Sequence, residues 1–250
     1  MKLQPQRKIL EIMTEEIRQH SEHDPHRPEW GLAEIILGGQ DGLVNVLGVI
    51  LGVAAATQDV RIVIAAGLAA TFAESVSMGA VAYTSTVAEA DYYESERARE
   101  YRHIEQVPNL EKDEIRNIYQ SKGFEGELLE RIVSTITSNQ DIWVAVMMAE
   151  EHRLMPTDRR DALRSALVVG FSAIIGSLIP LIPFGFLPVS LSMVVSVLVT
   201  AIVLFVVGAY KARLTVGRPG RSGLEMAMIG TISALVGYAV GVLMKVPSTP

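Results

Sequence analysis

The sequence predicts an all-α membrane protein with five transmembrane helices and a cytosolic three-helix insert between the second and third of them. Two observations lead to this prediction. Residues 165–210 contain no charged side chain and no histidine, and this stretch is long enough for two spans of about 20 residues each. The lysines and arginines are confined to alternate connecting segments, as in membrane proteins whose cytosolic loops are basic.

Shorter apolar stretches predict the other three spans. Residues 226–244 carry no charge and predict the fifth helix. Residues 42–58 predict the first helix, and residues 62–88, whose single charge is Glu74, predict the second. The three prolines of PLIPFGFLP, which begins at Pro180, predict the turn between the third and fourth helices.

The polar segment after the second span predicts a helical insert. No glycine or proline interrupts residues 89–107, so the second transmembrane helix is expected to continue beyond the membrane. Breaks at Pro108 and at Gly123 then predict three helices in the insert. The predicted domains are an N-terminal segment, two spans, the insert and three spans, at 1–30, 31–88, 89–158 and 159–250.

The distribution of basic residues predicts the orientation in the membrane. All lysines and arginines except Arg61 and Lys245 fall in residues 1–34, 89–164 and 211–221. The positive-inside rule therefore places the N-terminus and the insert in the cytosol. The first 30 residues are polar and lack the apolar core of a secretory signal. We expect a multi-pass protein of a bacterial plasma membrane, with a vacuolar or organellar membrane as the alternative.

Composition excludes some classes of site and partner. The chain has no cysteine, so neither disulfides nor thiolate metal sites can form. Its net charge of −6 gives no reason to expect nucleic-acid binding.

The first span contains a carboxylate and an amide among apolar residues and glycines. On a helix, Asp41 and Asn45 share one stripe with the small-xxx-small pairs Gly38/Gly42 and Gly48/Gly52. A charged side chain within a bilayer is costly and is usually retained for a function. We interpret the stripe as turning Asp41 toward another helix or an aqueous path, and the alternative is a packing seam with a hydrogen-bonded aspartate.

The second span carries a similar face. Glu74 and Met78 lie one helical turn apart. A carboxylate oxygen beside a thioether suits a borderline transition metal such as Fe²⁺, whereas an all-oxygen site favours Mg²⁺ or Ca²⁺. Methionine alone is weak evidence, because it more often fills gaps in a core.

The insert carries acidic groups on three predicted helices. Glu100 and His103 form an E-x-x-H, a spacing that places a carboxylate and an imidazole on one helix face for a shared metal ion. Glu111 and Glu114 follow the proline break at a spacing of three, and Glu151 closes WVAVMMAEE. These groups either converge on one metal cluster or form a solvated charged face.

Paired methionines precede the last of these glutamates. Met147 and Met148 can contribute thioether ligands to the same cluster, since soft sulfur donors suit transition metals. Alternatively, they cap a hydrophobic seam of the insert.

Taken together and in order, several motifs resemble the vacuolar iron transporter family, proton-coupled exporters of Fe²⁺ and Mn²⁺. The resemblance covers nearly all of residues 31–245. The matching segments are GGQDGLVNVLG, GLAATFAESVSMGAVAY, EADYYESERARE, VPNLEKDEI, WVAVMMAEE and SLIPLIPFGFLP.

The resemblance implies a homodimer of five-helix subunits with an ion path between the two copies of the first two spans. The family's membrane aspartate and methionine fall on Asp41 and Met78. The insert then resembles a metal-binding domain whose ligands fall on Glu100, Glu111, Glu114, Glu151 and Met147 or Met148. The family's second glutamate on the first insert helix falls on His103, and either this histidine or Glu105 supplies that ligand.

The membrane carboxylates and the family resemblance together predict an antiporter that exports Fe²⁺ or Mn²⁺ in exchange for protons. Its path is expected to include Asp41, Asn45, Glu74 and Met78. The expected partners are divalent ions (Fe²⁺, Mn²⁺, Co²⁺ or Zn²⁺), protons, the bilayer and a second copy of the chain, with no prosthetic group. A desolvated carboxylate that binds either a metal or a proton would couple the two. The alternatives are a membrane-anchored di-iron oxidase or iron-storage protein, and a structural membrane protein, which leaves Asp41 without a purpose.

Overall fold

The computed structural model describes residues 31–215 and 217–244, and the predicted N-terminal segment 1–30 lies outside this range. Within it, five helices are long and apolar enough to cross a membrane. The chain is therefore a multi-pass membrane protein, as predicted. The five spans are α2 (Leu32–Thr57), α3 (Val60–Gln106), α7 (Asp161–Leu181), α8 (Val189–Leu214) and α9 (Pro219–Leu243).

The first two spans form a helical hairpin with a very short connection. Gln58 adopts a positive φ of 52°, which ends α2 and reverses the chain. Asp59 caps α3, because its side-chain oxygen accepts hydrogen bonds from the backbone N–H groups of Arg61 and Ile62. The hairpin makes α2 and α3 antiparallel neighbours.

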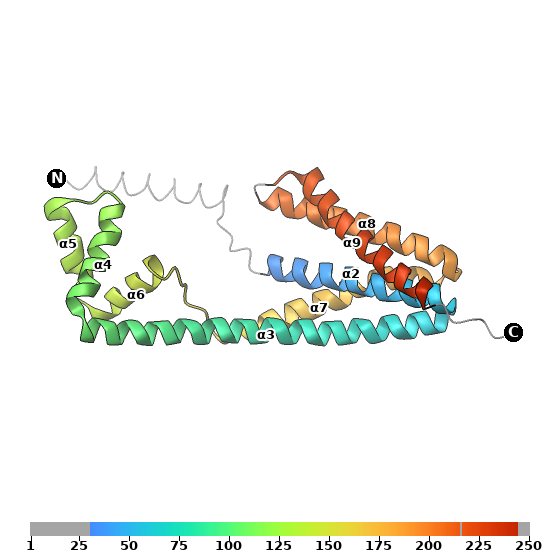
Figure 1. The fold of residues 1–250 in the computed structure, drawn as a ribbon, viewed down its shortest axis with the longest axis horizontal. Coiled ribbons are helices and arrows are strands. Elements are labelled where there is room, and N and C mark those ends of the chain that lie inside the picture. Colours follow the sequence, from blue (N-terminus) through green and yellow to red (C-terminus); the bar gives the residue numbers. More distant parts are fainter. Residues whose placement is uncertain (1–30, 216, 245–250) are drawn as a thin grey trace, which may run out of the picture. The chain divides into compact units, whose positions relative to one another are not determined.

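Helix α3 is continuous from the membrane-spanning region into the insert, as the sequence predicts (Figure 1). Its 47 residues correspond to a length of about 70 Å at 1.5 Å per residue. This is roughly twice the thickness of the hydrocarbon core of a bilayer. A single span therefore accounts for only part of α3, and the helix also packs against α4 and α6 of the insert.

The insert contains one more helix than the sequence predicts. After the end of α3 come α4 (Pro108–Ser121), α5 (Gly126–Thr137) and α6 (Gln140–Glu150). The breaks at Pro108 and Gly123 are confirmed, but the final segment is divided at Ser138–Asn139. Asn139 caps α6 by accepting hydrogen bonds from the N–H groups of Asp141 and Ile142. This cap was overlooked because no glycine or proline marks it.

Close backbone contacts hold the membrane helices together. A Cβ atom at Gly38 or Gly42 of α2 would overlap the backbone of α7, whereas a Cβ at Gly52 would lie 2.9 Å from the Gly237 carbonyl oxygen of α9. The two glycine pairs of α2 thus face two different helices. Small residues permit such approach within a bilayer.

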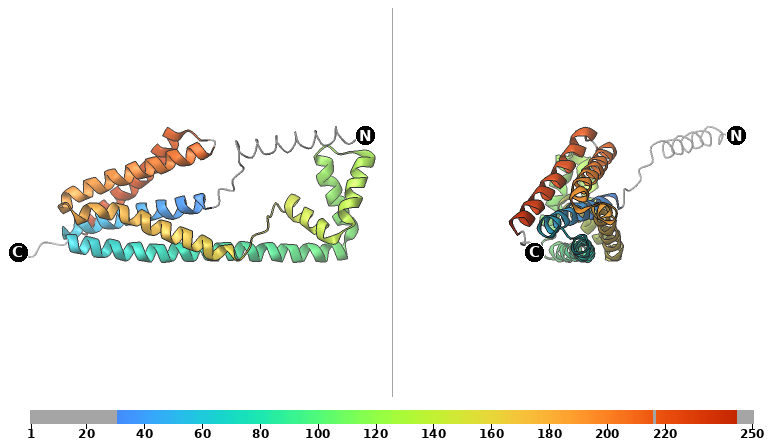
Figure 2. Two further views of the ribbon diagram at one scale, coloured as in Figure 1. Left: turned by 180° about the vertical axis from the view of Figure 1, so that it is seen from behind. Right: turned by 90° about the vertical axis from the view of Figure 1, so that its right-hand side faces the viewer.

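The third span packs along the membrane-spanning half of α3 (Figure 2). The Ser75 hydroxyl donates a 2.9 Å hydrogen bond to the Gly170 carbonyl oxygen of α7. At the other end of α7, prolines interrupt the helix and free backbone carbonyls. Two serines of α8 satisfy them: Ser196 donates to the Pro180 oxygen at 2.6 Å, and Ser192 donates to the Pro183 oxygen at 3.1 Å.

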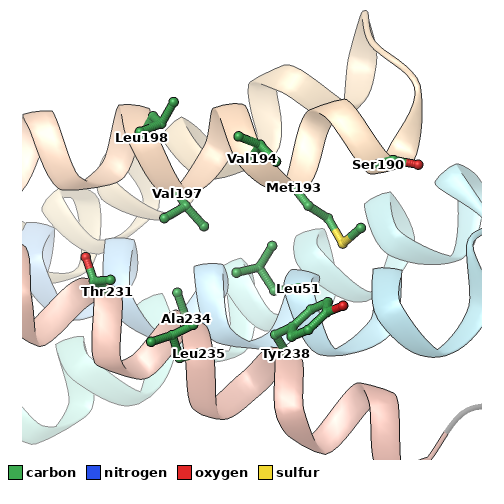
Figure 3. A pocket seen from close by; sticks show the side chains of 10 residues that line it. All are labelled: Leu51, Ser190, Met193, Val194, Val197, Leu198, Thr231, Ala234, Leu235 and Tyr238. Atoms are coloured by element: carbon green, nitrogen blue, oxygen red, sulfur yellow. The ribbon is translucent and has the colours of Figure 1, made fainter.

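An apolar crevice of about 370 Å³ lies between α2, α8 and α9 (Figure 3). Leu51, Met193 and Leu235 are among the side chains that line it, and its polar groups are the hydroxyls of Ser190, Thr231 and Tyr238. No carboxylate or imidazole belongs to this lining. Its lining therefore contains neither of the carboxylate and imidazole donors on which the candidate metal sites of this chain are built.

The glycine contacts predict a sharp positional effect of adding one methyl group. Gly237→Ala places a Cβ against the Gly48 carbonyl oxygen of α2, whereas Gly220→Ala near the start of α9 meets no atom within 4 Å. Overpacking of this kind costs about 1–3 kcal/mol. We expect thermal unfolding in detergent, followed by size-exclusion chromatography, to show a lowered midpoint for Gly237→Ala alone. Equal midpoints for the two variants would contradict the close contact.

Candidate functional site

The membrane-spanning half of the structure brings two carboxyl groups together. The Glu74 carboxyl group of α3 interacts with the Asp41 carboxyl group and with the Asn45 side chain, both on α2. The sequence predicted a polar face on each span but did not pair them. Two acidic groups and an amide therefore form one polar cluster within helices that otherwise present mostly apolar residues.

The hairpin explains why these residues meet. The Ile50 side chain of α2 lies against Gly67 of α3, where a Cβ atom would overlap it. The two helices are antiparallel. A residue about two turns after Gly67 on α3 therefore lies beside a residue two to three turns before Ile50 on α2. Those positions are Glu74 and Asp41.

The cluster lies at the edge of the subunit rather than in its core. Asp41 and Glu74 are half-buried, and Asn45 is exposed. Met78, one turn beyond Glu74, is also half-buried. On α3, Ser77 and Val81 lie on the same side of the helix as Glu74, and both are exposed, Val81 at 54%. The helices of one chain therefore do not enclose this polar cluster.

The insert contains a second cluster, built on α3 and α4. The His103 Nδ1 atom lies 3.7 Å from Glu100 Oε1 and 3.6 Å from Glu111 Oε1. Glu100 and Glu111 are 2% and 3% exposed. Their Oε2 atoms are buried and have no hydrogen-bond partner among the described residues. Buried carboxylate oxygens without partners are costly unless they bind a cation.

The end of α6 adds a second group of ligand atoms to this cluster. Glu100, Glu151 and His152 offer atoms that all lie within 4.8 Å of one another. The His152 Nε2 atom lies 3.0 Å from Glu100 Oε1. The sequence does not predict His152 as a ligand, because Ala149 stands where the glutamate of a second E-x-x-H motif would be. The signal was the adjacent Glu151–His152 pair at the helix end.

The arrangement of acids raises the pKa of two carboxyl groups. Burial, the neighbouring Glu114 and Glu100, and to a lesser extent Glu151, raise the pKa of Glu111 to about 7. Burial and the same neighbouring acids also raise the pKa of Glu151, although His152 and His103 oppose this effect. The negative charge of the cluster is therefore uncompensated, which favours binding of either protons or a cation.

Three of the predicted ligands of the insert occupy other surroundings. Met147 and Met148 are fully buried and belong to the hydrophobic core of the insert, which includes Ile115 and Trp143. Glu105 is exposed and belongs to neither group of potential ligands. The acidic and imidazole groups that the structure brings together in the insert are those of Glu100, His103, Glu111, Glu114, Glu151 and His152, of which Glu100 and Glu111 are buried.

Comparison with known proteins gives consistent matches along the whole described region. A sequence model of the VIT family matches residues 32–242. The chain is similar to vacuolar iron transporter 1 of Oryza sativa subsp. japonica, with 32% identity over 238 residues that cover 92% of this chain and 94% of the relative. It is similar to vacuolar iron transporter 1 of Arabidopsis thaliana, with 33% identity over 208 residues and 83% of each chain. The vacuolar iron transporter of Plasmodium falciparum is 30% identical over 224 residues, 86% of this chain and 82% of the relative.

The raised pKa of Glu111 predicts how the stability of the metal-free insert depends on pH. Its folded-state pKa, about 7, lies above the ordinary value of 4.5, so the folded state retains a proton that the unfolded state releases. The stabilisation is complete below the ordinary pKa and is lost as the pH rises through about 7. We therefore expect the insert to resist urea less at pH 8 than at pH 5.

Fluorescence of the buried Trp143 checks this prediction, in the presence of a chelator and in a Trp30→Phe background that leaves one tryptophan. Glu111→Gln removes the titrating group, so the urea concentration at the midpoint of unfolding should change less between pH 5 and pH 8. Glu127→Gln, at an exposed position of α5, is the matched control. If the urea midpoint of Glu111→Gln changed with pH as much as that of its parent, Glu111 would not be the group whose titration sets the pH dependence of stability.

Proposed function

Because the chain belongs to the VIT family, we propose that it is an antiporter that exports Fe²⁺, with Mn²⁺ as a second substrate, from the cytosol in exchange for protons. The family and the five spans make it a membrane transporter of metal ions. The observation that carries the finer proposal is the contact of Glu74 with Asp41 and Asn45 between the first two spans.

The membrane cluster has the chemistry that exchange requires. Two neighbouring carboxylates repel each other, and a divalent cation between them relieves the repulsion. Protons relieve it as well, so binding of the metal and binding of protons are mutually exclusive. In our proposal Asp41 and Glu74 bind the metal ion on its way out and carry protons on the way back, while Asn45 adds a neutral oxygen ligand. Met78, one turn farther along α3, supplies a thioether that favours a transition metal over Mg²⁺.

A second copy of the chain completes the proposed ion path. Asn45 is exposed beside half-buried Asp41 and Glu74, and polar side chains facing lipid are costly. The side of α3 that carries Glu74 continues into the exposed residues Ser77 and Val81. Pairing of the first two spans of two copies would cover both surfaces, so we propose a homodimer with the path at its interface.

The insert supplies metal to this path in the proposed mechanism. Its buried oxygens on Glu100 and Glu111 lack partners among the described residues, and the distances between ligand atoms suit a shared cation. The continuous α3 connects Glu100 to Glu74 without a hinge. We propose that the insert collects metal ions in the cytosol, the side to which the basic segments assign it.

The membrane in which the protein resides is a further part of the proposal. The relatives are named vacuolar transporters. We propose the plasma membrane of a bacterium as the location, with a vacuolar membrane as the alternative.

The di-iron oxidase alternative is less well supported. Such sites combine carboxylates with two E-x-x-H motifs, and this sequence contains one, at Glu100. His152 brings a second imidazole to Glu100, but from a helix end rather than from that motif. Oxygen uptake with Fe²⁺ and no transport would favour the oxidase.

The central role of Asp41 predicts a loss of transport. Asp41→Asn keeps the shape of the side chain and removes the charge, so Fe²⁺ transport into proteoliposomes with an imposed pH gradient should fall by at least about tenfold. Asp59→Asn is the matched control, because asparagine also caps a helix and this position ends the α2–α3 connection.

Transport by Asp59→Asn should equal that of the unmodified protein. Unimpaired transport by Asp41→Asn would remove Asp41 from the mechanism and with it the proposed membrane site.

A further inference from the structure

Two imidazoles approach one oxygen atom in the insert. Glu100 Oε1 lies 3.0 Å from His152 Nε2 and 3.7 Å from His103 Nδ1. The two histidines come from opposite ends of the insert sequence, one from α3 and one from the residues after α6. Glu100 therefore belongs to two groups of potential ligands, one with His103 and Glu111 and the other with His152 and Glu151.

The spacing of these atoms is that of ligands around a shared ion. With bonds of about 2.1 Å to nitrogen or oxygen, ligand atoms at tetrahedral or octahedral angles lie about 3.0–3.5 Å apart. The observed separations of 3.0, 3.6 and 3.7 Å need only small side-chain shifts to meet this condition. The second oxygen of Glu100 is buried and unpartnered among the described residues, so Glu100 retains a free ligand atom.

The backbone after α6 fixes the position of His152. The N–H groups of His152 and Leu154 donate hydrogen bonds to the carbonyl oxygens of Met147 and Met148, which are themselves buried in the core of the insert. Arg153 adopts a φ of 56°, a left-handed conformation that is unfavourable for a residue with a side chain. A strained residue persists only where its surroundings hold it, and such strain is common at ligand sites.

We propose that His152 is a metal ligand and that, together with His103, it makes the insert selective for Fe²⁺, Co²⁺ and Zn²⁺ over Mn²⁺, Mg²⁺ and Ca²⁺. Imidazole nitrogen suits the first group of ions, whereas carboxylate oxygen suits the second. This inference rests on the proposed role of the insert in collecting metal. It adds a ligand and a selectivity to that role.

The competing explanation is that His152 only positions Glu100 through a hydrogen bond. Glutamine distinguishes the two explanations, because its amide nitrogen can donate the same hydrogen bond but does not replace an imidazole as a ligand. His152→Gln therefore preserves a positioning role and removes a coordinating one. Glu150→Gln is the matched control, since Glu150 is exposed at the end of α6 and pairs with Lys122.

The experiment uses the full chain in detergent with Co²⁺ and Mn²⁺ as probes. His20, His23 and His26 are first replaced by asparagine, so that His103 and His152 are the remaining histidines. Titrations of this parent should show that His152→Gln weakens Co²⁺ binding by about tenfold or more, changes the visible absorption of bound Co²⁺, and weakens Mn²⁺ binding by a smaller factor. Glu150→Gln should match the parent.

A second measurement does not depend on how the His152 variant folds. In the parent carrying His103→Gln, His152 is the single histidine, and X-ray absorption of bound Co²⁺ should show the scattering pattern of an imidazole ligand. Absence of that pattern, or a His152→Gln protein with the parent's Co²⁺ spectrum and affinity, would overturn the proposal. Failure of the unmodified chain to transport Fe²⁺ would instead count against the proposed function, because these binding measurements do not involve transport.

Discussion

Two like-charged groups placed side by side inside a membrane protein are the constraint on which the rest of the structure depends. Asp41 and Glu74 come from different spans and meet because a short hairpin makes those spans antiparallel neighbours. In the low dielectric of a membrane their repulsion is screened less than at a surface in water. A proton or a cation must therefore accompany the pair, and this requirement gives a physical reason for the exchange that we propose. The glycines of α2 serve the same arrangement, since they allow α7 and α9 to approach closely while the polar side of the helix stays open.

The insert repeats this chemistry outside the membrane. Glu100 and Glu111 are as buried as core residues, and the hydrophobic cluster around Met147 and Trp143 holds the helices that carry them. Two imidazoles lie beside its acids, whereas the membrane cluster has an amide instead. Helix α3 contributes to both clusters and is unbroken between them, so one continuous helix connects the two. This connection suits a protein in which one site collects an ion and the other passes it on.

The fold was largely predictable from the sequence because lipid imposes simple rules. Uncharged stretches of about 20 residues identify membrane spans, and the absence of glycine or proline after Ala88 predicted the continuation of α3. The division between α5 and α6 was missed, because an asparagine cap is a weaker signal than a proline. Among the site residues, Glu100, His103 and Glu111 were recognisable from their spacing. The contact of Asp41 with Glu74, and the approach of His152 to Glu100, depend on how distant segments pack, which a one-dimensional pattern does not encode.

Simultaneous recording of Fe²⁺ and proton fluxes in one proteoliposome preparation shows whether the protein exchanges the two ions. With a dye for each ion enclosed in the vesicles, we expect Fe²⁺ that enters the lumen to be matched by protons that leave it. In Glu74→Gln, whose neutral side chain cannot exchange a proton, the proton flux that accompanies each Fe²⁺ should fall. Fe²⁺ flux without any opposing proton movement in the unmodified protein, or an unchanged ratio of the two fluxes in Glu74→Gln, would contradict the proposal that the Asp41–Glu74 pair couples the two ions.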